Sequence, residues 1–319
     1  MKHLLVVGLG SIGARHARNL INLNHKVSAL ICRSGGVPKE FQNVDHYYNF
    51  DDLDLDNIDG AIICTPTAFH MEYIEKFVHR GMPVLVEKPI SHQMTGVEEI
   101  AIKIKEFKVP VMVGFNFRYH PQINKIKQIL DEGKLGNYLY ANLCWSDDIR
   151  EWYKDGRYKV NYTSRPELGG GALRTMCHEL DLARWFFGKH EKAEGCARKI
   201  SLLDIGEVDD IFTGSLCYQG EFRCMIHLDF ITKVPNRMIT IAGEKGTIIW
   251  DYYNGKLTYK IEGQQEHSEI IGPVTAEFKN EMYLEEVKDF IALIDGKGIN
   301  PIPFDDGVEV QKTISDFLN

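Results

Sequence analysis

A glycine-rich loop near the N-terminus constrains the fold of this chain more than any other feature. Gly8, Gly10 and Gly13 occur in the segment GLGSIG, directly after the apolar run Leu4 to Val7. An amphipathic pattern from Ile12 to Leu23 follows at once. A strand, a tight glycine turn and a helix in this order are typical of the first β-α unit of a doubly wound parallel sheet.

Apolar runs and helical patterns alternate along the rest of the first 120 residues. The apolar runs, which we predict to be strands, are 4–7, 27–31, 60–64, 84–86 and 111–114. Helical patterns occupy 12–23, 68–80 and 96–107. Strands that are apolar throughout and separated by helices indicate a parallel sheet covered on both faces. We therefore predict an α/β protein whose N-terminal domain, residues 1–120, is a Rossmann-type doubly wound sheet.

The pattern changes after Pro121. Helices are predicted over about 122–132, over 172–187 after the triplet Gly169-Gly170-Gly171, and over 282–294; a strand is predicted over 138–146. Between residues 193 and 261 short strand-like segments are joined by turns. Residues 121–319 are thus expected to form an α+β domain on a mostly antiparallel sheet.

Composition limits the class of protein. A chain of 319 residues, 44% apolar and 26% charged, suits two globular domains. No stretch approaches the roughly 20 apolar residues that span a bilayer, and the N-terminal residues do not resemble a signal peptide. We expect a cytoplasmic protein with no membrane partner.

Cysteines and charges exclude several kinds of site. The seven cysteines form no C-x-x-C pair, which argues against a disulfide framework or a zinc knuckle. A net charge of −8 gives no basic footprint for nucleic acid. No His/Asp/Glu cluster has metal-ligand spacing, so no metal is predicted. The acidic pairs are expected to be exposed turn residues; they are 51–52, 147–148, 209–210 and 305–306.

The glycine loop predicts a dinucleotide site. The first glycine permits the tight turn, the second lets a pyrophosphate approach the backbone, and the third allows close helix–strand packing. The helix that begins near Ser11 and Ile12 would point its free N–H groups at the phosphates. The second predicted strand ends in Cys32-Arg33-Ser34, with no carboxylate for a ribose 2′-hydroxyl. Arg33 and Ser34 suit a 2′-phosphate, so NADP(H) is favoured; NAD(H) remains possible if Arg33 stacks on the adenine of either cofactor.

Polar segments follow the ends of three further predicted strands. Cys64-Thr65-Pro66 and His70 follow the third long strand, Glu87-Lys88-Pro89 follows the next, and Asn116 follows the last. Ligands of doubly wound sheets bind beyond the carboxyl ends of the strands, so these segments are expected to line the cofactor cleft. For His70 the alternative is an incidental histidine at a helix start.

These motifs, in this order and spacing, resemble the glucose–fructose oxidoreductase / inositol dehydrogenase (Gfo/Idh/MocA) family. The resemblance covers nearly the whole chain and is carried by 8–13, 64–70, 87–89, 114–118, 169–171 and His178. It implies a Rossmann domain, a second domain with a large open sheet, and oxidation or reduction of a carbohydrate-type alcohol or ketone. Members usually associate through that sheet, so a homodimer or homotetramer is expected.

The resemblance also implies catalytic residues. The lysine of the E-K-P motif, here Lys88, sits beside the nicotinamide in the family, and an ammonium there favours a developing alkoxide or polarises a carbonyl. The family histidine maps to His178, which is expected to relay the proton; the alternative is a purely structural histidine. Many members carry an aspartate three or four residues earlier, where this chain has Arg174 and Thr175.

Three consequences of that departure stay open. In the first, proton transfer rests on Lys88 and His178 alone. In the second, Asp181 partly replaces the aspartate, and in the third, Arg174 adapts the site to an anionic substrate. The spacing of Arg174, His178, Asp181 and Trp185 predicts one polar stripe on the helix over 172–187. Softer candidates for substrate contact are Arg118, Tyr119, Trp152 and Arg165, for which a solvated loop is the alternative.

We therefore expect an NAD(P)-dependent oxidoreductase acting on a CH–OH group of a sugar, sugar phosphate or nucleotide sugar. Two other classes remain. One is a relative that uses its dinucleotide transiently to cleave a glycosidic bond with no net redox change. The other is a dinucleotide-sensing regulator, against which Lys88 and His178 argue because binding alone requires neither.

Overall fold

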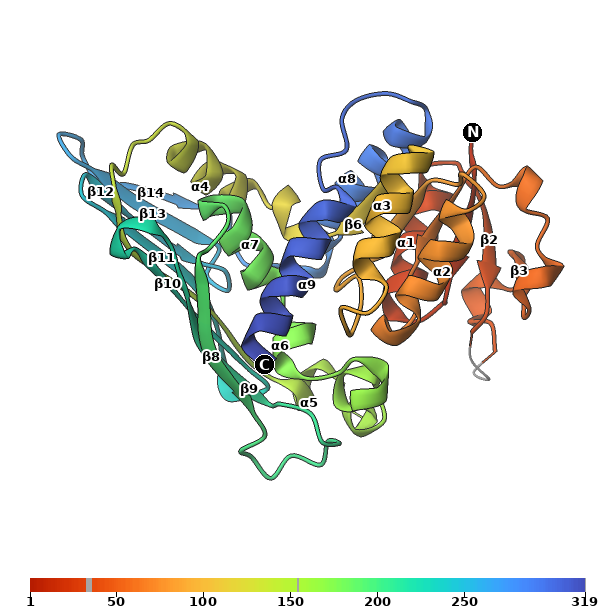
Figure 1. Ribbon diagram of the computed structural model, residues 1–319, viewed down its shortest axis with the longest axis horizontal. Coiled ribbons are helices and arrows are strands. Elements are labelled where there is room, and N and C mark those ends of the chain that lie inside the picture. The colour runs from red at the N-terminus through yellow and green to blue at the C-terminus, as the bar shows by residue number, and fades with distance from the viewer. Residues whose placement is uncertain (33–35, 154, 319) are drawn as a thin grey trace. The chain divides into compact units, whose positions relative to one another are not determined.

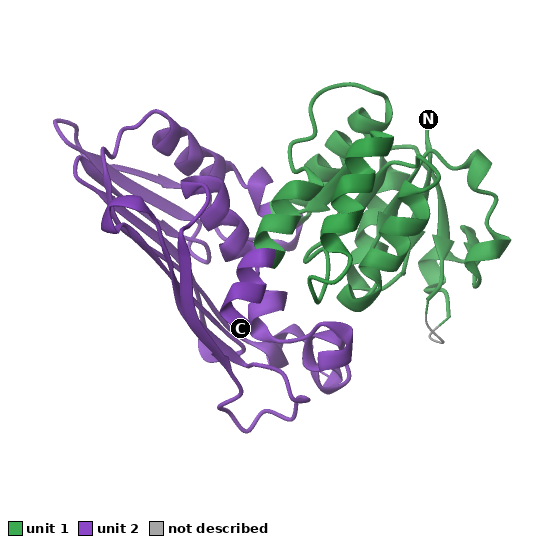
Figure 2. Ribbon diagram, in the orientation of Figure 1, with its two compact units in different colours: residues 1–116, 280–311 green, residues 117–279, 312–319 purple. Residues whose placement is uncertain are grey.

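The computed structural model describes residues 1–32, 36–153 and 155–318. These residues form two compact units, coloured separately in Figure 2: residues 1–116 with 280–311, and residues 117–279 with 312–319. The sequence predicts a division at residue 120 with a continuous second domain. Residues 280–311 return to the first unit instead, and no local pattern encodes this, because an amphipathic helix looks the same whichever unit it packs on.

The first unit contains a six-stranded sheet in the order β3-β2-β1-β4-β5-β6, with every neighbouring pair parallel (Figure 1). This order confirms the predicted doubly wound sheet. Residues 4–7 of the first strand are fully buried, which fits a sheet without a solvent face. The third strand is short and polar, so hydrophobic periodicity does not reveal it. The strands are β1 (His3–Val7), β2 (Lys26–Leu30), β3 (Asp45–Tyr47), β4 (Gly60–Ile63), β5 (Val84–Glu87) and β6 (Val111–Gly114).

Helices lie between these strands in the sequence, and further helices follow the last strand of the second sheet. They are α1 (Ser11–Asn22), α2 (His70–Val78), α3 (Val97–Phe107), α8 (Ala276–Ile294) and α9 (Phe304–Leu318). The last of these is absent from the sequence prediction. The start of α8 beyond residue 280 packs on α1, with the rings of His16 and Tyr283 5.7 Å apart. In the described parts of the chain, no helix combines the length and the apolar character needed to cross a membrane.

The second unit contains an eight-stranded sheet in the order β14-β13-β12-β11-β7-β10-β9-β8. All pairs are antiparallel except β7 with β10, which confirms the predicted mostly antiparallel sheet. Its strands are β7 (Tyr138–Asp148), β8 (Lys192–Arg198), β9 (Ile211–Cys217), β10 (Arg223–Asp229), β11 (Ile231–Gly243), β12 (Gly246–Asp251), β13 (Lys256–Ile261) and β14 (His267–Ile270).

One face of this sheet is covered and the other is open. Leu143, Ile226 and Ile239 share one row of the register and are buried on the covered face. In Figure 1, α4 (Pro121–Asp131) and α7 (His178–Phe187) lie over one side of this sheet. The open face carries apolar side chains that remain 40–45% exposed: Tyr140, Met225 and Ile249. The strand register places Met225 and Ile249 in one row across the sheet, with Asn142 and Thr240 between them.

The predicted helix over 172–187 is wrong as a single element. It is two helices, α6 (Ala172–Thr175) and α7, because Met176 (φ −98°, ψ 24°) and Cys177 (ψ 1°) leave the helical region. The start of α6 is anchored separately, since the carboxylate of Asp209 accepts a hydrogen bond from the Leu173 N–H at 2.8 Å. The predicted polar stripe therefore does not continue from Arg174 to the later residues.

The acidic pairs are not all exposed, contrary to the prediction. Asp147, Asp148 and Asp210 are at most 8% exposed. Asp210 accepts hydrogen bonds from the backbone N–H groups of Ile200 and Ser201, each at 2.9 Å. Asp148 caps the short helix α5 (Ile149–Trp152). Carboxylates can be buried when backbone donors satisfy them, and a sequence pattern does not reveal those donors.

Candidate active site

The glycine loop has the geometry of a phosphate-binding turn. Gly8 has φ +91°, and a Cβ on Gly13 would lie 1.8 Å from the Gly8 carbonyl oxygen, so both positions require glycine. A Cβ on Gly10 would meet nothing within 4 Å, which leaves open space above the turn. The N-terminus of α1 follows at Ser11 and has no side-chain cap. Its free N–H groups and helix dipole suit an anion, so these residues fit a dinucleotide pyrophosphate.

The carboxyl ends of four parallel strands bring the other predicted cofactor residues to the same edge. The register pairs Val7 with Ile63 and Glu87 with Gly114, and β5 lies between β4 and β6. The segments after these strands start at Gly8, Cys64, Lys88 and Phe115. The strand order reverses at β1 and β4, where doubly wound sheets bind their ligands.

The loop after β4 is tied to the loop after β5 through His70. This histidine is 1% exposed, and its ring nitrogens lie 2.9 Å from the Thr65 carbonyl oxygen and 2.8 Å from the Pro89 carbonyl oxygen. Burial lowers the pKa of His70. The ring thus holds the Cys64-Thr65-Pro66 turn against the E-K-P segment. Contact between His70 and a cofactor stays a prediction.

Lys88 directly follows β5, at the place where the sequence analysis puts it. Its side chain is half-buried, and the Lys88–Pro89 peptide bond is cis. The preceding Glu87 is 8% exposed and lies 2.9 Å from His16 Nε2 through its Oε1 atom. The other predicted cofactor residues on this unit are Asn116, which is 2% exposed, and Arg33 and Ser34, which lie outside the described residues.

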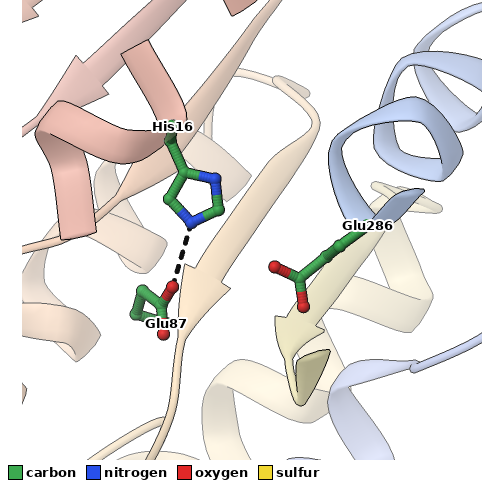
Figure 3. Close-up of side chains that lie close together, drawn as sticks. All are labelled: His16, Glu87 and Glu286. Atoms are coloured by element: carbon green, nitrogen blue, oxygen red, sulfur yellow. Dashed lines mark hydrogen bonds and ion pairs between the residues drawn. The ribbon is translucent and has the colours of Figure 1, made fainter. Parts of the chain in front are cut away.

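A cluster that the sequence analysis missed lies beside this segment (Figure 3). His16 from α1, Glu87 from β5 and Glu286 from α8 each offer one ligand atom, and these atoms lie within 4.8 Å of one another. We call these three residues the carboxyl cluster. They are far apart in sequence, so a search for metal-ligand spacing could not find them. The cluster could hold a proton or a cation.

His178 is the first residue of α7 and lies in an aromatic environment. It is 5% exposed, with its ring 5.0 Å from that of Phe117 and 6.1 Å from that of Trp145. The guanidinium of Arg237 stacks on the rings of Phe117 and Trp145, at 3.6 and 4.1 Å. The Nε of Arg237 donates to Glu179 Oε1 at 2.6 Å. Cation–π contacts and a buried ion pair thus fix the surroundings of His178; the sequence analysis did not single out Arg237 or Glu179.

Two predicted substrate contacts, Arg118 and Asp181, bind each other. Arg118 donates from Nε at 3.0 Å and from a terminal nitrogen at 2.5 Å to the two carboxylate oxygens of Asp181. The side chains are 6% and 1% exposed. A bidentate, buried pair of this kind satisfies both charges. A substrate contact by either residue stays a prediction and must compete with this pairing.

The remaining predicted substrate contacts differ in exposure. Trp152 packs on Trp145 and Phe230, with ring centres 5.8 and 5.5 Å away. Arg165 is exposed and pairs with Glu167. Tyr119 and Arg174 are half-buried; burial lowers the pKa of the Arg174 guanidinium, against the attraction of Asp209. None of these positions by itself defines a substrate.

Two family models match the chain. The oxidoreductase family model with an NAD-binding Rossmann fold covers residues 2–115, and the GFO/IDH/MocA C-terminal domain covers residues 123–249. The chain belongs to the GFO/IDH/MocA oxidoreductase family. The resemblance stated from the motifs is thereby confirmed, together with a nicotinamide dinucleotide as the cofactor class.

Individual relatives resemble the chain over most of its length. Inositol 2-dehydrogenase of Rhizobium meliloti (strain 1021) is 26% identical over 313 residues, 93% of this chain and 90% of the relative. A 2,7-anhydro-N-acetylneuraminate hydratase of Mediterraneibacter gnavus (strain ATCC 29149 / DSM 114966 / JCM 6515 / VPI C7-9) is 22% identical, covering 82% of this chain and 70% of the relative. Levoglucosan dehydrogenase in complex with NADH and levoglucosan superposes with a TM-score of 0.87 at 18% identity, covering 99% and 96% of the two chains. This last likeness shows the fold.

Proposed function

We propose that the protein transfers hydride between a nicotinamide cofactor and a hydroxyl-bearing or ketone carbon of a sugar, sugar phosphate or nucleotide sugar. One observation carries the proposal. The glycine turn, with the uncapped N-terminus of α1, and the E-K-P lysine follow strands of one parallel sheet and lie at the same edge of it. A binding site alone would need the turn but not the lysine. The names of the inositol and levoglucosan dehydrogenases support a carbohydrate substrate.

The roles of the residues follow from their chemistry. Gly8, Gly10 and the first turn of α1 hold the pyrophosphate of the cofactor, which supplies or accepts the hydride when bound. The ammonium of Lys88 lowers the energy of negative charge on the reacting oxygen. His178 takes the proton from that oxygen or returns it. With Asp181 bound to Arg118, the route through Lys88 and His178 is the one we favour among the three alternatives.

We propose NADP(H) as the preferred cofactor, because Arg33 and Ser34 follow β2 where a carboxylate would be needed to hold a free ribose hydroxyl. The KM values for NADPH and NADH decide this. Arg33→Ala should raise the KM for NADPH far more than that for NADH. Lys26→Ala, an exposed residue on the preceding strand, serves as the control. A preference for NADH that Arg33→Ala leaves unchanged would refute the assignment.

A second candidate function is a reaction with no net redox change. The relative named as a hydratase supports it, because its name describes no oxidation or reduction. In that case the cofactor would stay tightly bound, and product would form without added NADP(H) or NAD(H). A dinucleotide-sensing regulator would show neither turnover nor cofactor consumption.

A substrate panel separates these functions. Sugars, sugar phosphates and nucleotide sugars are incubated with each oxidised and reduced cofactor, and cofactor absorbance and product are both followed. The proposed function predicts cofactor conversion in equal amount to product for at least one substrate class. Product without cofactor conversion would favour the second candidate.

We further propose that the open face of the second sheet mediates self-association. The exposed Tyr140, Met225 and Ile249 give this face apolar contact area. Light scattering after size-exclusion chromatography should show a dimer or tetramer that Ile249→Lys dissociates. A monomeric wild-type protein would contradict this.

A further inference from the structure

The carboxyl cluster contains an excess of buried negative groups. His16 and Glu286 are 0% exposed and Glu87 is 8% exposed. Figure 3 shows the carboxyl group of Glu286 directed towards the His16–Glu87 pair. Both carboxyl oxygens of Glu286 are buried and have no hydrogen-bond partner among the residues that the structure describes. A buried carboxyl group in this position needs a proton or a cation.

The groups around the cluster do not supply a basic partner for its carboxyls. On α1, Arg15 stacks over the Tyr283 ring at 4.7 Å instead. Burial, and then the charges of Glu87 and Glu286, raise the pKa of the Cys64 thiol. Lys88 follows Glu87 in the chain. Within the described ranges, no lysine or arginine forms an ion pair with Glu87 or Glu286.

We propose that Glu286 is a neutral carboxylic acid in the folded protein and acts, through Glu87, as a positioning residue for Lys88. His16 already satisfies one oxygen of Glu87 at 2.9 Å, so Glu286 is the member without a partner. One proton satisfies it and removes the repulsion between the two carboxyls. Burial, and then the charge of Glu87, raise the pKa of Glu286 well above its ordinary value, which agrees with the geometry.

The cluster controls Lys88 because Glu87 is the last residue of β5. The Glu87 side chain is confined by His16 on one side and by the neighbouring strand on another, where a Cβ on Gly114 would lie 3.2 Å from the Glu87 Cδ atom. Glu286 approaches from α8. With its side chain bordered by groups from three elements, Glu87 fixes the end of β5, which Lys88 follows in the chain. This part of the inference rests on the proposed function of Lys88.

The first test concerns protonation and needs no substrate. Above pH 4.5, the ordinary carboxyl pKa, the folded protein keeps the Glu286 proton while the unfolded chain loses it. Folding therefore takes up one proton, and the wild-type folding constant should fall by up to about tenfold per pH unit as the pH rises through this window. Glu286→Gln should lack this contribution and should be at least as stable as wild type at neutral pH.

The control for this test is Glu285→Gln, on the same helix. Glu285 is 54% exposed and pairs with Lys288, so its variant should keep the wild-type pH slope. Identical slopes for wild type and Glu286→Gln would overturn the neutral-acid assignment. So would one equivalent of tightly bound metal in the purified protein, or a stabilisation by Zn²⁺, Mn²⁺ or Mg²⁺ that Glu286→Gln abolishes.

The second test concerns positioning. Glu286→Leu keeps the volume but removes the polar group and its proton from beside Glu87, and should lower kcat on the order of tenfold to a hundredfold with little change in cofactor KM. Glu286→Gln, which keeps a neutral polar group of the same shape beside Glu87, should recover most of that loss. Equal kcat in the leucine variant and wild type would refute positioning. Failure of the proposed function would appear separately, as no turnover in wild type while the pH test still holds.

Discussion

The two units bury charge in opposite ways. In the second unit, buried Arg118 and Arg237 each meet a buried carboxylate, Asp181 and Glu179 respectively. In the first unit, the carboxyl cluster brings two glutamates and a histidine together, and neither glutamate pairs with a lysine or arginine within the described residues. Matched pairs hold a fold in place. Like groups buried together make the structure depend on a proton, as is common where chemistry takes place.

The largest effect is expected at Lys88 and should fall on activity alone. Lys88→Ala removes the ammonium that stabilises charge on the reacting oxygen, so kcat should fall by about 10²–10⁴-fold. Cofactor Kd and the free energy of unfolding should stay near wild type, as measured by fluorescence titration and denaturant unfolding. Lys105→Ala, at a 66% exposed lysine of the same unit, provides the control. Substantial activity left in Lys88→Ala would eliminate the mechanism.

Substitutions in the buried ion pairs of the second unit should change the stability of the protein. Arg237→Met leaves Glu179 buried without its cation, and the free energy of unfolding should drop by about 3–5 kcal/mol. Adding Glu179→Leu should recover much of the loss, because no buried charge then remains. Urea unfolding measures both variants. A loss below about 1 kcal/mol for Arg237→Met would mean that the pair resembles a surface ion pair, and the contrast between the units would disappear.

The glycine loop offers a comparison within one turn. Gly13→Ala places a methyl group 1.8 Å from a backbone oxygen and should destabilise the first unit by about 1–3 kcal/mol. Gly10→Ala meets open space, so stability should hold while cofactor affinity falls about tenfold, equivalent to about 1.4 kcal/mol. Denaturant unfolding and cofactor titration separate the two effects. Unchanged affinity in Gly10→Ala would place the phosphates elsewhere.

At neutral pH the smallest effect is expected at His120, because its contribution changes only in acid. Burial and then Arg237 lower its pKa to about 3, and its Nδ1 accepts the Gln122 N–H at the start of α4 at 3.2 Å. The neutral ring stabilises the fold above pH 6.5, and this stabilisation is lost as the pH falls from 6.5 towards 3, by up to about 1.4 kcal/mol per unit. His120→Asn keeps a capping oxygen and should show a shallower slope between pH 7 and 5. Equal slopes would show that His120 does not titrate in this way.

Much of the first unit follows from sequence because its signals are local. The apolar runs and the glycine turn predict β1, β4, β5, β6 and α1 within a residue or two. The carboxyl ends of those strands share an edge in any parallel sheet, which is why the motif after each strand could be assigned to one site. The GFO/IDH/MocA resemblance extended this to the second sheet.

The rest depended on contacts between distant residues. Glu286 joins Glu87 only because residues 280–311 return to the first unit. Asp181 was predicted from helical spacing, but its partner Arg118 lies 63 positions away. Asp209, which anchors the start of α6, comes from a later loop. The periodicity of apolar residues predicts which side of a helix or strand is buried. It does not predict which charged group of a distant element will contact that side.

The central claim is that hydride passes between the cofactor and a substrate carbon, with Lys88 serving the attached oxygen. The most direct measurement uses reduced cofactor carrying deuterium at nicotinamide C4, in both stereochemical forms, with the ketone identified by the substrate panel. Mass spectrometry should find one deuterium on the product carbon from one of the two forms, and Lys88→Ala should suppress its appearance. Product that forms without deuterium from either form would contradict the account.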